Sequence, residues 1–119
     1  MSGRELPPNV QQQLLRLQQL QQSLAVLLNE KQRLEAELAE VSTALEEVGK
    51  MADGAVLYKA VGPVLIQTSK EKMLAELSER KELADTRLKV LERQEARARG
   101  QIDTLQKEIQ RLVSGGQAQ

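Results

Sequence analysis

The chain has 119 residues, enough for one modest domain, and its 17 basic and 17 acidic side chains cancel to a formal net charge of zero. This balance predicts no net attraction to nucleic acid or to an anionic membrane, and the absence of cysteine excludes disulfides and thiolate metal sites. Tyr58 is the single aromatic residue, so we expect a thin core of aliphatic side chains, as between two paired helices.

Residues 9–49 are predicted to form a first long helix. Apolar residues recur at alternating steps of three and four, which is the spacing of a left-handed coiled-coil seam. The predicted seam positions are Leu17, Leu20, Leu24, Leu27, Lys31, Leu34, Leu38, Val41, Leu45 and Val48. Upstream, Val10 and Leu14 join this seam only through two successive three-residue steps, which predicts overwinding or loosened pairing near that end. Pro7 and Pro8 stand where a helix can begin, and Gly49 is expected to end it.

Residues 55–68, AVLYKAVGPVLIQT, predict a β-hairpin with strands at about Val56–Val61 and Val64–Thr68. Gly62-Pro63 suits a two-residue type II′ turn, because glycine adopts the positive φ that the first turn position needs. A lone two-stranded hairpin is marginal in water and leaves two open edges, so we expect several chains to combine their hairpins. The alternative is a hairpin folded back onto its own helix ends. The residues predicted to carry oligomerisation are Val56, Leu57, Tyr58, Val61, Val64, Leu65 and Ile66.

Residues 69–113 predict a second long helix, opened by a capping box at Thr68-Ser69-Lys70-Glu71. Its seam positions are Leu74, Leu77, Lys81, Ala84, Leu88, Leu91, Glu95, Ala98, Ile102, Leu105, Ile109 and Leu112. Gly115-Gly116 is expected to end it, which leaves residues 114–119 as a flexible tail.

The two helices are of similar length and their connection spans about 20 residues, which favours an antiparallel pair within one chain. A parallel dimer of two chains is the alternative. The antiparallel register places Val10 near Leu112 and Val48 near Leu74, and it brings the seam charges Lys31 and Glu95 close enough to pair. The fold class is therefore predicted as mainly α: a long antiparallel two-helix coiled coil with one central β-hairpin.

The sequence offers little for catalysis. Histidine and cysteine are absent, no phosphate-binding glycine loop is present, and no cluster of residues has metal-ligand spacing. We therefore expect no enzyme activity, no cofactor and no metal. The sequence contains no apolar run of about 18 residues, so it predicts no membrane span. The start MSGRELPPNV lacks the apolar core of a signal peptide, so we expect a cytoplasmic protein.

This arrangement resembles the prefoldin family, in particular its β-type subunits and most closely the archaeal ones. The resemblance covers residues 6–113 and rests on the opening LPPNVQQQLLRLQQLQQ, the central ALEEVGKMADGAVLYKAVGPVLI and the later KELADTRLKVLERQEARARGQIDTLQKEIQ. The single hairpin matches the β type, because α-type subunits carry two.

The resemblance implies a hexamer of two α-type and four β-type subunits, joined by an intersubunit β-barrel from which six coiled coils project. It also implies an ATP-independent holdase that binds non-native client proteins and delivers them to a group II chaperonin. The zero net charge and the lack of a long apolar run predict no nucleic-acid or membrane partner.

The client-binding residues are expected at the free ends of the two helices, where residues 6–29 carry Arg16 as their one basic residue and are rich in glutamine. The predicted set is Leu6, Val10, Leu14, Leu17, Leu105, Ile109, Leu112 and Val113, with Leu15, Val26 and Leu28 widening the apolar stripe beside the seam. These residues could equally be ordinary seam positions. The alternative function is a structural coiled-coil scaffold that binds one defined protein partner.

Overall fold

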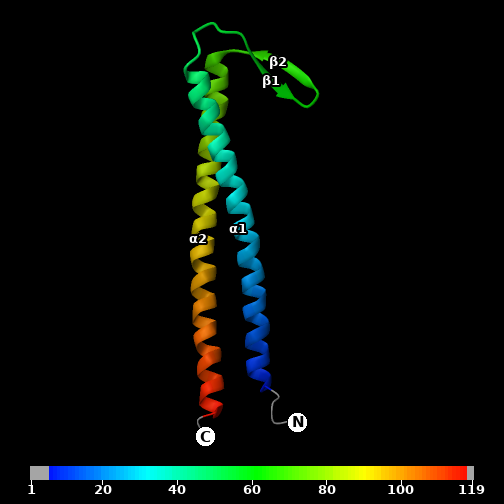
Figure 1. Cartoon of the computed structure of the whole chain (residues 1–119), viewed down its shortest axis with the longest axis vertical. Coiled ribbons are helices and arrows are strands. Elements are labelled where there is room, and N and C mark those ends of the chain that lie inside the picture. The colour runs from blue at the N-terminus through cyan, green and yellow to red at the C-terminus, as the bar shows by residue number, and fades with distance from the viewer. Residues whose placement is uncertain (1–5, 118–119) are drawn as a thin grey trace. The chain divides into compact units, whose positions relative to one another are not determined.

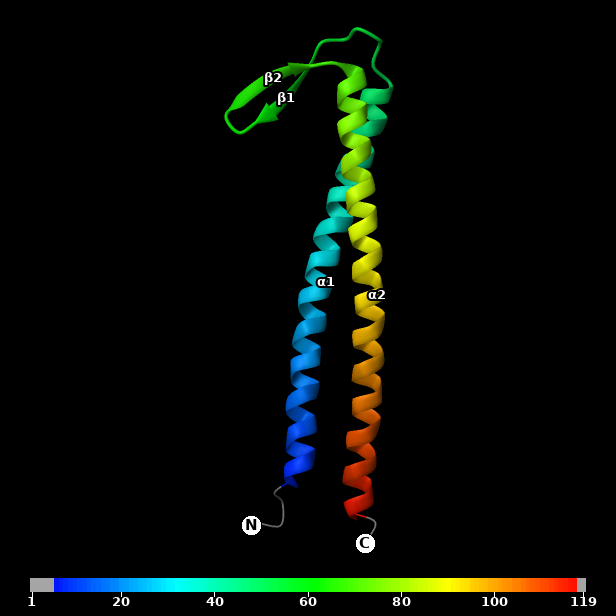
Figure 2. The same cartoon turned by 180° about the vertical axis from the view of Figure 1, so that it is seen from behind.

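The computed structural model describes residues 6–117, in the order α1 (Pro8–Gly49), β1 (Leu57–Val61), β2 (Val64–Thr68) and α2 (Lys70–Gln117) (Figure 1). The predicted fold of two long helices with one hairpin between them is confirmed. The chain forms two compact units. We call residues 32–90 the hairpin unit and the described parts of the other, residues 6–31 and 91–117, the terminal unit. Within each unit, the α1 and α2 segments lie side by side and run in opposite directions, as Figure 2 also shows.

The predicted start and end of α1 are confirmed within one residue. Pro8 begins the helix, where its fixed φ is favourable and its missing N–H has no intrahelical partner to lose. Gly49 is the last residue of α1, and the following loop includes Gly54 at a φ of 85°.

The predicted boundaries of α2 need two corrections. The N-cap is Ser69, one residue after the predicted Thr68, because the Ser69 hydroxyl accepts a hydrogen bond of 3.2 Å from the backbone N–H of Lys72. At the other end, α2 passes Gly115 and ends at Gln117, beyond the predicted Val113. Both Gly115 and Gly116 lie within the helix. Each glycine costs about 1 kcal/mol there, and the helical bonds of the preceding turns are enough to propagate through the two.

The predicted seam is confirmed along both helices, because almost all of its positions are buried or half-buried. Val41, Leu77, Ala84, Leu91, Ala98 and Leu105 are buried. Lys81 is the exception, since its side chain lies exposed, as a long lysine stem readily allows.

The predicted phase break near the start of α1 is wrong. Val10 is 2% exposed and Gln13 is half-buried, whereas Leu14 is 39% exposed. The seam therefore continues from Val10 through Gln13 to Leu17 in regular steps of three and four. Gln13 also lines a groove between the helices together with Leu20 of α1 and residues of α2. The polar Gln13 therefore occupies a seam position, and the apolar Leu14 lies outside the seam.

The hairpin has the predicted two-residue turn. Val61 pairs with Val64, and Gly62 has the positive φ of 56° that the turn requires. β1 begins at Leu57, so Val56 lies just outside the strand in which it was predicted. Leu57 pairs with Thr68 at the open end of the ladder.

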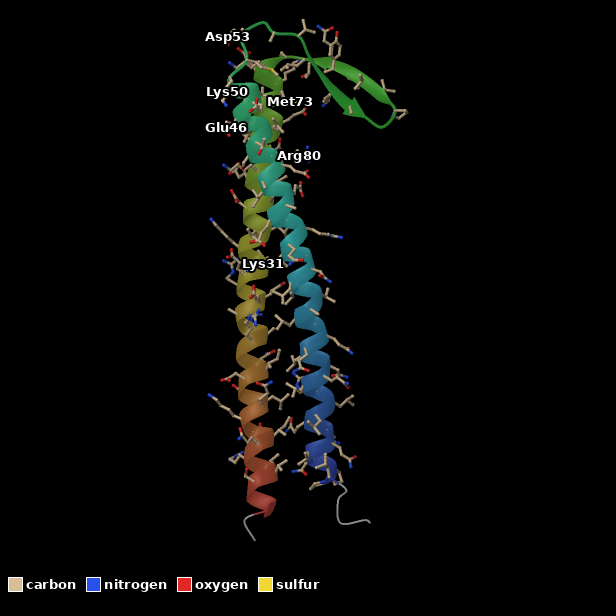
Figure 3. The ribbon with its side chains drawn as sticks, in the orientation of Figure 1. Lys31, Glu46, Lys50, Asp53, Met73 and Arg80 are labelled. Atoms are coloured by element: carbon tan, nitrogen blue, oxygen red, sulfur yellow. The ribbon has the colours of Figure 1, made fainter. Side chains whose placement is uncertain are left out.

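Two lysines connect the hairpin and its loop to the first turns of α2. Lys59 on β1 forms an ion pair of 2.7 Å with Glu76. Lys70 donates a hydrogen bond of 2.7 Å to the backbone carbonyl of Met51 and lies 3.4 Å from the carboxylate of Asp53, which is labelled in Figure 3. These contacts join one face of β1 and the connecting loop to the α2 segment of the hairpin unit.

Candidate functional site

The hairpin presents an exposed apolar surface. Leu65 is 69% exposed and Tyr58 is 59% exposed, and the larger set of exposed apolar residues is Val56, Tyr58, Val61, Val64, Leu65 and Ile66. Leu57 is half-buried. All seven residues predicted for oligomerisation therefore lie together on or beside the hairpin. The apolar residues occupy both faces, because cross-strand partners share a face and successive residues alternate.

The edges of this sheet are open. Within residues 6–117, β1 and β2 pair only with each other. Each strand therefore offers one row of backbone N–H and C=O groups to a further strand. Exposed apolar side chains together with unpaired edges are the features of an interface that another chain can complete.

The structure brings the predicted client-binding residues together in the terminal unit, but with unequal exposure. Val10 and Leu105 are buried, Leu17, Ile109, Leu112 and Val113 are half-buried, and Leu6 and Leu14 are exposed. In the intact pair of helices, Leu6 and Leu14 are accessible to another molecule, whereas Val10 and Leu105 become accessible only when the helices separate.

Two exposed apolar residues of α1 were misplaced by the sequence pattern. Leu15 is 57% exposed and Val26 is 65% exposed, so both lie away from the seam instead of beside it. Leu14 and Leu15 line an open groove of about 450 Å³ on α1 together with Leu17, Gln11, Gln18 and Gln21. Leu15 and Val26 lie away from the seam because the seam keeps its regular spacing through Gln13. Assigning Gln13 to the seam would have placed both residues correctly from the sequence.

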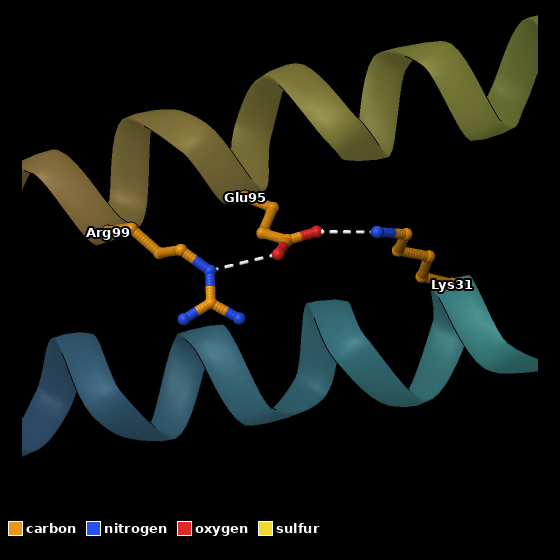
Figure 4. A network of polar contacts seen from close by, with 3 residues as sticks. All are labelled: Lys31, Glu95 and Arg99. Atoms are coloured by element: carbon orange, nitrogen blue, oxygen red, sulfur yellow. Dashed lines mark hydrogen bonds and ion pairs between the residues drawn. The ribbon is translucent and has the colours of Figure 1, made fainter.

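One network of charges lies in the seam of the terminal unit (Figure 4). The ammonium of Lys31 is 3.0 Å from one carboxylate oxygen of Glu95, and Arg99 donates a hydrogen bond of 2.9 Å to the other oxygen. The predicted pairing of Lys31 with Glu95 is therefore confirmed. The hydrogen bond from Lys31, followed by that from Arg99, lowers the pKa of Glu95 from its ordinary value of 4.5. The network stabilises the charged form of a carboxylate that occupies a seam position.

Neither a metal centre nor a membrane span is found in the part of the chain that the structure describes. Residues 6–117 contain no cluster of carboxylates that could hold a metal ion. In the same range, neither helix has a stretch that is both long and apolar enough to cross a bilayer.

The fold and its exposed surface define a class of protein: two long antiparallel helices with a two-stranded sheet whose edges are open to pairing with other chains. Comparison with known proteins gives the family. The sequence profile described as "Prefoldin subunit" matches residues 11–116. The prefoldin subunit beta of Archaeoglobus fulgidus is 42% identical over 110 residues, which cover 92% of this chain and 95% of the relative. That of Pyrococcus furiosus is 43% identical over 105 residues, covering 88% of this chain and 90% of the relative.

A solved structure agrees with the sequence comparisons. The crystal structure of the prefoldin beta subunit from Thermococcus strain KS-1 superposes with a TM-score of 0.84 at 39% identity, covering 90% of this chain and 94% of that chain. The chain belongs to the prefoldin family and is of its β type. Members of this family are non-enzymatic chaperone components that assemble into multi-subunit complexes.

Proposed function

We propose that this chain is a holdase subunit that binds non-native proteins through its terminal unit without using ATP. The observation that carries the proposal is the set of exposed apolar side chains on α1 and just before it: Leu6, Leu14, Leu15 and Val26. Apolar surface that is accessible to solvent and surrounded by uncharged polar residues can bind many unfolded sequences, because unfolded chains share exposed apolar side chains and little else. The half-buried Leu17, Ile109, Leu112 and Val113 extend this surface when the helix ends separate.

The second part of the proposal concerns assembly. Two α-type subunits and four copies of this chain form a hexamer in which the hairpins combine into an intersubunit β-barrel. The exposed hairpin residues and the open strand edges support this arrangement, because joining the hairpins buries the former and pairs the latter. In this proposal the whole chain acts as one prefoldin-like domain, with the hairpin for assembly and the helices for binding.

The last part of the proposal places the complex in the cytoplasm, where it passes its clients to a group II chaperonin. It is supported by the resemblance to prefoldin β subunits. A transfer assay with labelled client and purified group II chaperonin tests it, since the client should leave the complex and appear on the chaperonin without added nucleotide.

Assembly is tested by native mass spectrometry of this chain alone and after mixing with an α-type prefoldin subunit. We expect a complex of two α-type chains and four copies of this chain. The variant Leu65→Asp places a charge on an exposed hairpin residue, so it should prevent assembly while leaving the helical content unchanged. The matched control Leu83→Asp introduces the same change at a similarly exposed residue of α2. If this chain stays a monomer or dimer and does not bind the α-type chain, the proposed intersubunit β-barrel is wrong.

Client binding is tested by suppression of aggregation with several unrelated unfolded proteins. Removing residues 1–17 and 105–119 should leave assembly intact and abolish the protection. If the shortened chain protects clients normally, the assignment of client binding to the removed helix ends is wrong. If the full chain protects only one protein, the alternative of a scaffold with one defined partner replaces the holdase.

A further inference from the structure

The outer face of α1 in the terminal unit carries a second regular stripe, opposite the seam. It consists of Gln11, Leu15, Gln18, Gln22, Val26 and Asn29, spaced by three or four residues, and all six side chains are exposed. We call these six residues the outer stripe. It contains no charge. In the hairpin unit the same face of α1 continues with charged residues, Arg33, Glu40 and Glu47. The neutral stripe is therefore confined to the terminal unit.

The α2 segment of the same unit has the opposite character. Its exposed residues include Arg93, Arg97, Arg99, Asp103, Lys107 and Arg111. The α2 segment thus exposes several charged side chains, whereas the outer stripe of α1 exposes four amides and two apolar side chains; the exposed Arg16 of α1 lies outside the stripe. A neutral surface repels neither acidic nor basic partners, because it has no net charge to oppose theirs.

The spacing of the two apolar residues limits what can occupy the stripe. A partner helix would need apolar contacts at every three or four residues, and the outer stripe supplies only Leu15 and Val26. These two lie eleven residues apart on α1, a distance of about 16 Å along the helix axis. An extended polypeptide covers that distance in about five residues. Leu15 and Val26 therefore suit two apolar side chains of an extended segment, one near each end.

The amides between them suit the backbone of such a segment. Gln18 and Gln22 lie between Leu15 and Val26, and each amide carries both a donor NH₂ and an acceptor oxygen. An unfolded chain exposes an N–H and a C=O at nearly every residue, whatever its sequence. Side-chain amides can therefore pair with any extended segment, whereas a folded partner has most of these groups already bonded within itself.

We propose that the outer stripe binds extended segments of non-native proteins, with Leu15 and Val26 holding apolar side chains and Gln18 and Gln22 hydrogen-bonding the backbone between them. This inference rests on the proposed holdase function and deepens it. It assigns the first contact to the intact helix pair, so the seam does not need to open for a client to bind.

The test uses the assembled complex and a defined probe, an uncharged fluorescent peptide with two leucines about five residues apart. Binding is followed by fluorescence anisotropy. The variant Leu15→Ser/Val26→Ser should bind about ten-fold more weakly, since two apolar contacts are lost. The control Leu83→Ser changes a residue with the same 65% exposure as Val26 outside the terminal unit, and its affinity should stay within about two-fold of wild type. Equal losses in both variants would overturn the proposal.

Backbone recognition is tested with a second peptide that is N-methylated between its leucines. The wild-type complex should bind it several-fold more weakly than the parent peptide. The variant Gln18→Ala/Gln22→Ala should bind both peptides equally, because the groups that distinguish them are gone. If the wild-type complex binds the two peptides with equal affinity, the assignment of the glutamines is wrong.

If the stripe variants alter the size of the complex without altering peptide binding, the stripe is a self-association surface and the proposal fails.

The proposed function and this inference fail in different ways. If the wild-type complex does not suppress aggregation of unfolded proteins, the holdase function itself is wrong. If it does so and the stripe variants perform equally well, only the assignment to the outer stripe is wrong.

Discussion

The pairing of the two helices should depend most on Leu91, because its side chain is 0% exposed. Replacing it with alanine removes a buried isobutyl group from a thin core and leaves a cavity that two helices alone cannot easily refill. We expect Leu91→Ala to lower the free energy of unfolding by about 3 kcal/mol. For a chain of 119 residues this corresponds to a fall in melting temperature of about 12 °C.

The control is Leu83→Ala, eight residues earlier on α2, where the side chain is 65% exposed. Both variants make the same exchange in the same helix, so the effect of helix propensity cancels and the difference reports burial. The expected loss for Leu83→Ala is below about 1 kcal/mol. Guanidinium unfolding followed by far-ultraviolet circular dichroism, at one chain concentration, measures both. Equal losses would refute the conclusion that the seam stabilises the pair.

Three further predictions concern the charged network and the hairpin. Lys31→Glu and Glu95→Lys should each destabilise the helix pair, and the double exchange should restore part of the lost stability. The restoration is only partial because the new lysine would face Arg99. Thermal melting of the three variants measures this, and an absence of coupling would contradict the pairing. Lys31 and Arg99 lower the pKa of Glu95, so the stability that the Glu95 carboxylate contributes is present above its ordinary pKa of 4.5 and is lost as the pH falls through the lowered pKa. Glu95→Gln should therefore weaken the pH dependence of the free energy of unfolding in that acidic range. An unchanged pH profile would exclude this contribution. Gly62→Ala forces alanine to a φ of 56°, at a cost of about 1 to 2 kcal/mol, so native mass spectrometry should show less assembled complex, and undiminished assembly would mean that the turn can rearrange.

The sequence predicted much of this fold because its patterns are local and periodic. Leucines at alternating steps of three and four predicted the seam, since helical geometry places such residues on one side whatever they pack against. The pair Gly62-Pro63 predicted the hairpin turn in the same way, because few residues tolerate that backbone conformation. The salt bridge of Lys31 with Glu95 was predictable once an antiparallel register had been assumed.

The errors arose where side-chain type and position disagree. Leu14 was assigned to the seam because it is apolar, yet the seam passes through Gln13, and the regularity of the backbone prevailed over hydrophobicity. α2 continued through Gly115 and Gly116 because helix propagation tolerates residues that on propensity alone predict an end.

The sequence by itself determined that this protein consists of two long helices, one hairpin and an aliphatic seam without catalytic groups, because these features depend on residue type and spacing along the chain. Only the tertiary structure decided which apolar residues remain available for other molecules. Val10 and Leu105 are buried, while Leu15 and Val26 are exposed, although all four are aliphatic residues on the same two helices. Exposure depends on what lies opposite each side chain, and that is settled when the two helices pack against each other.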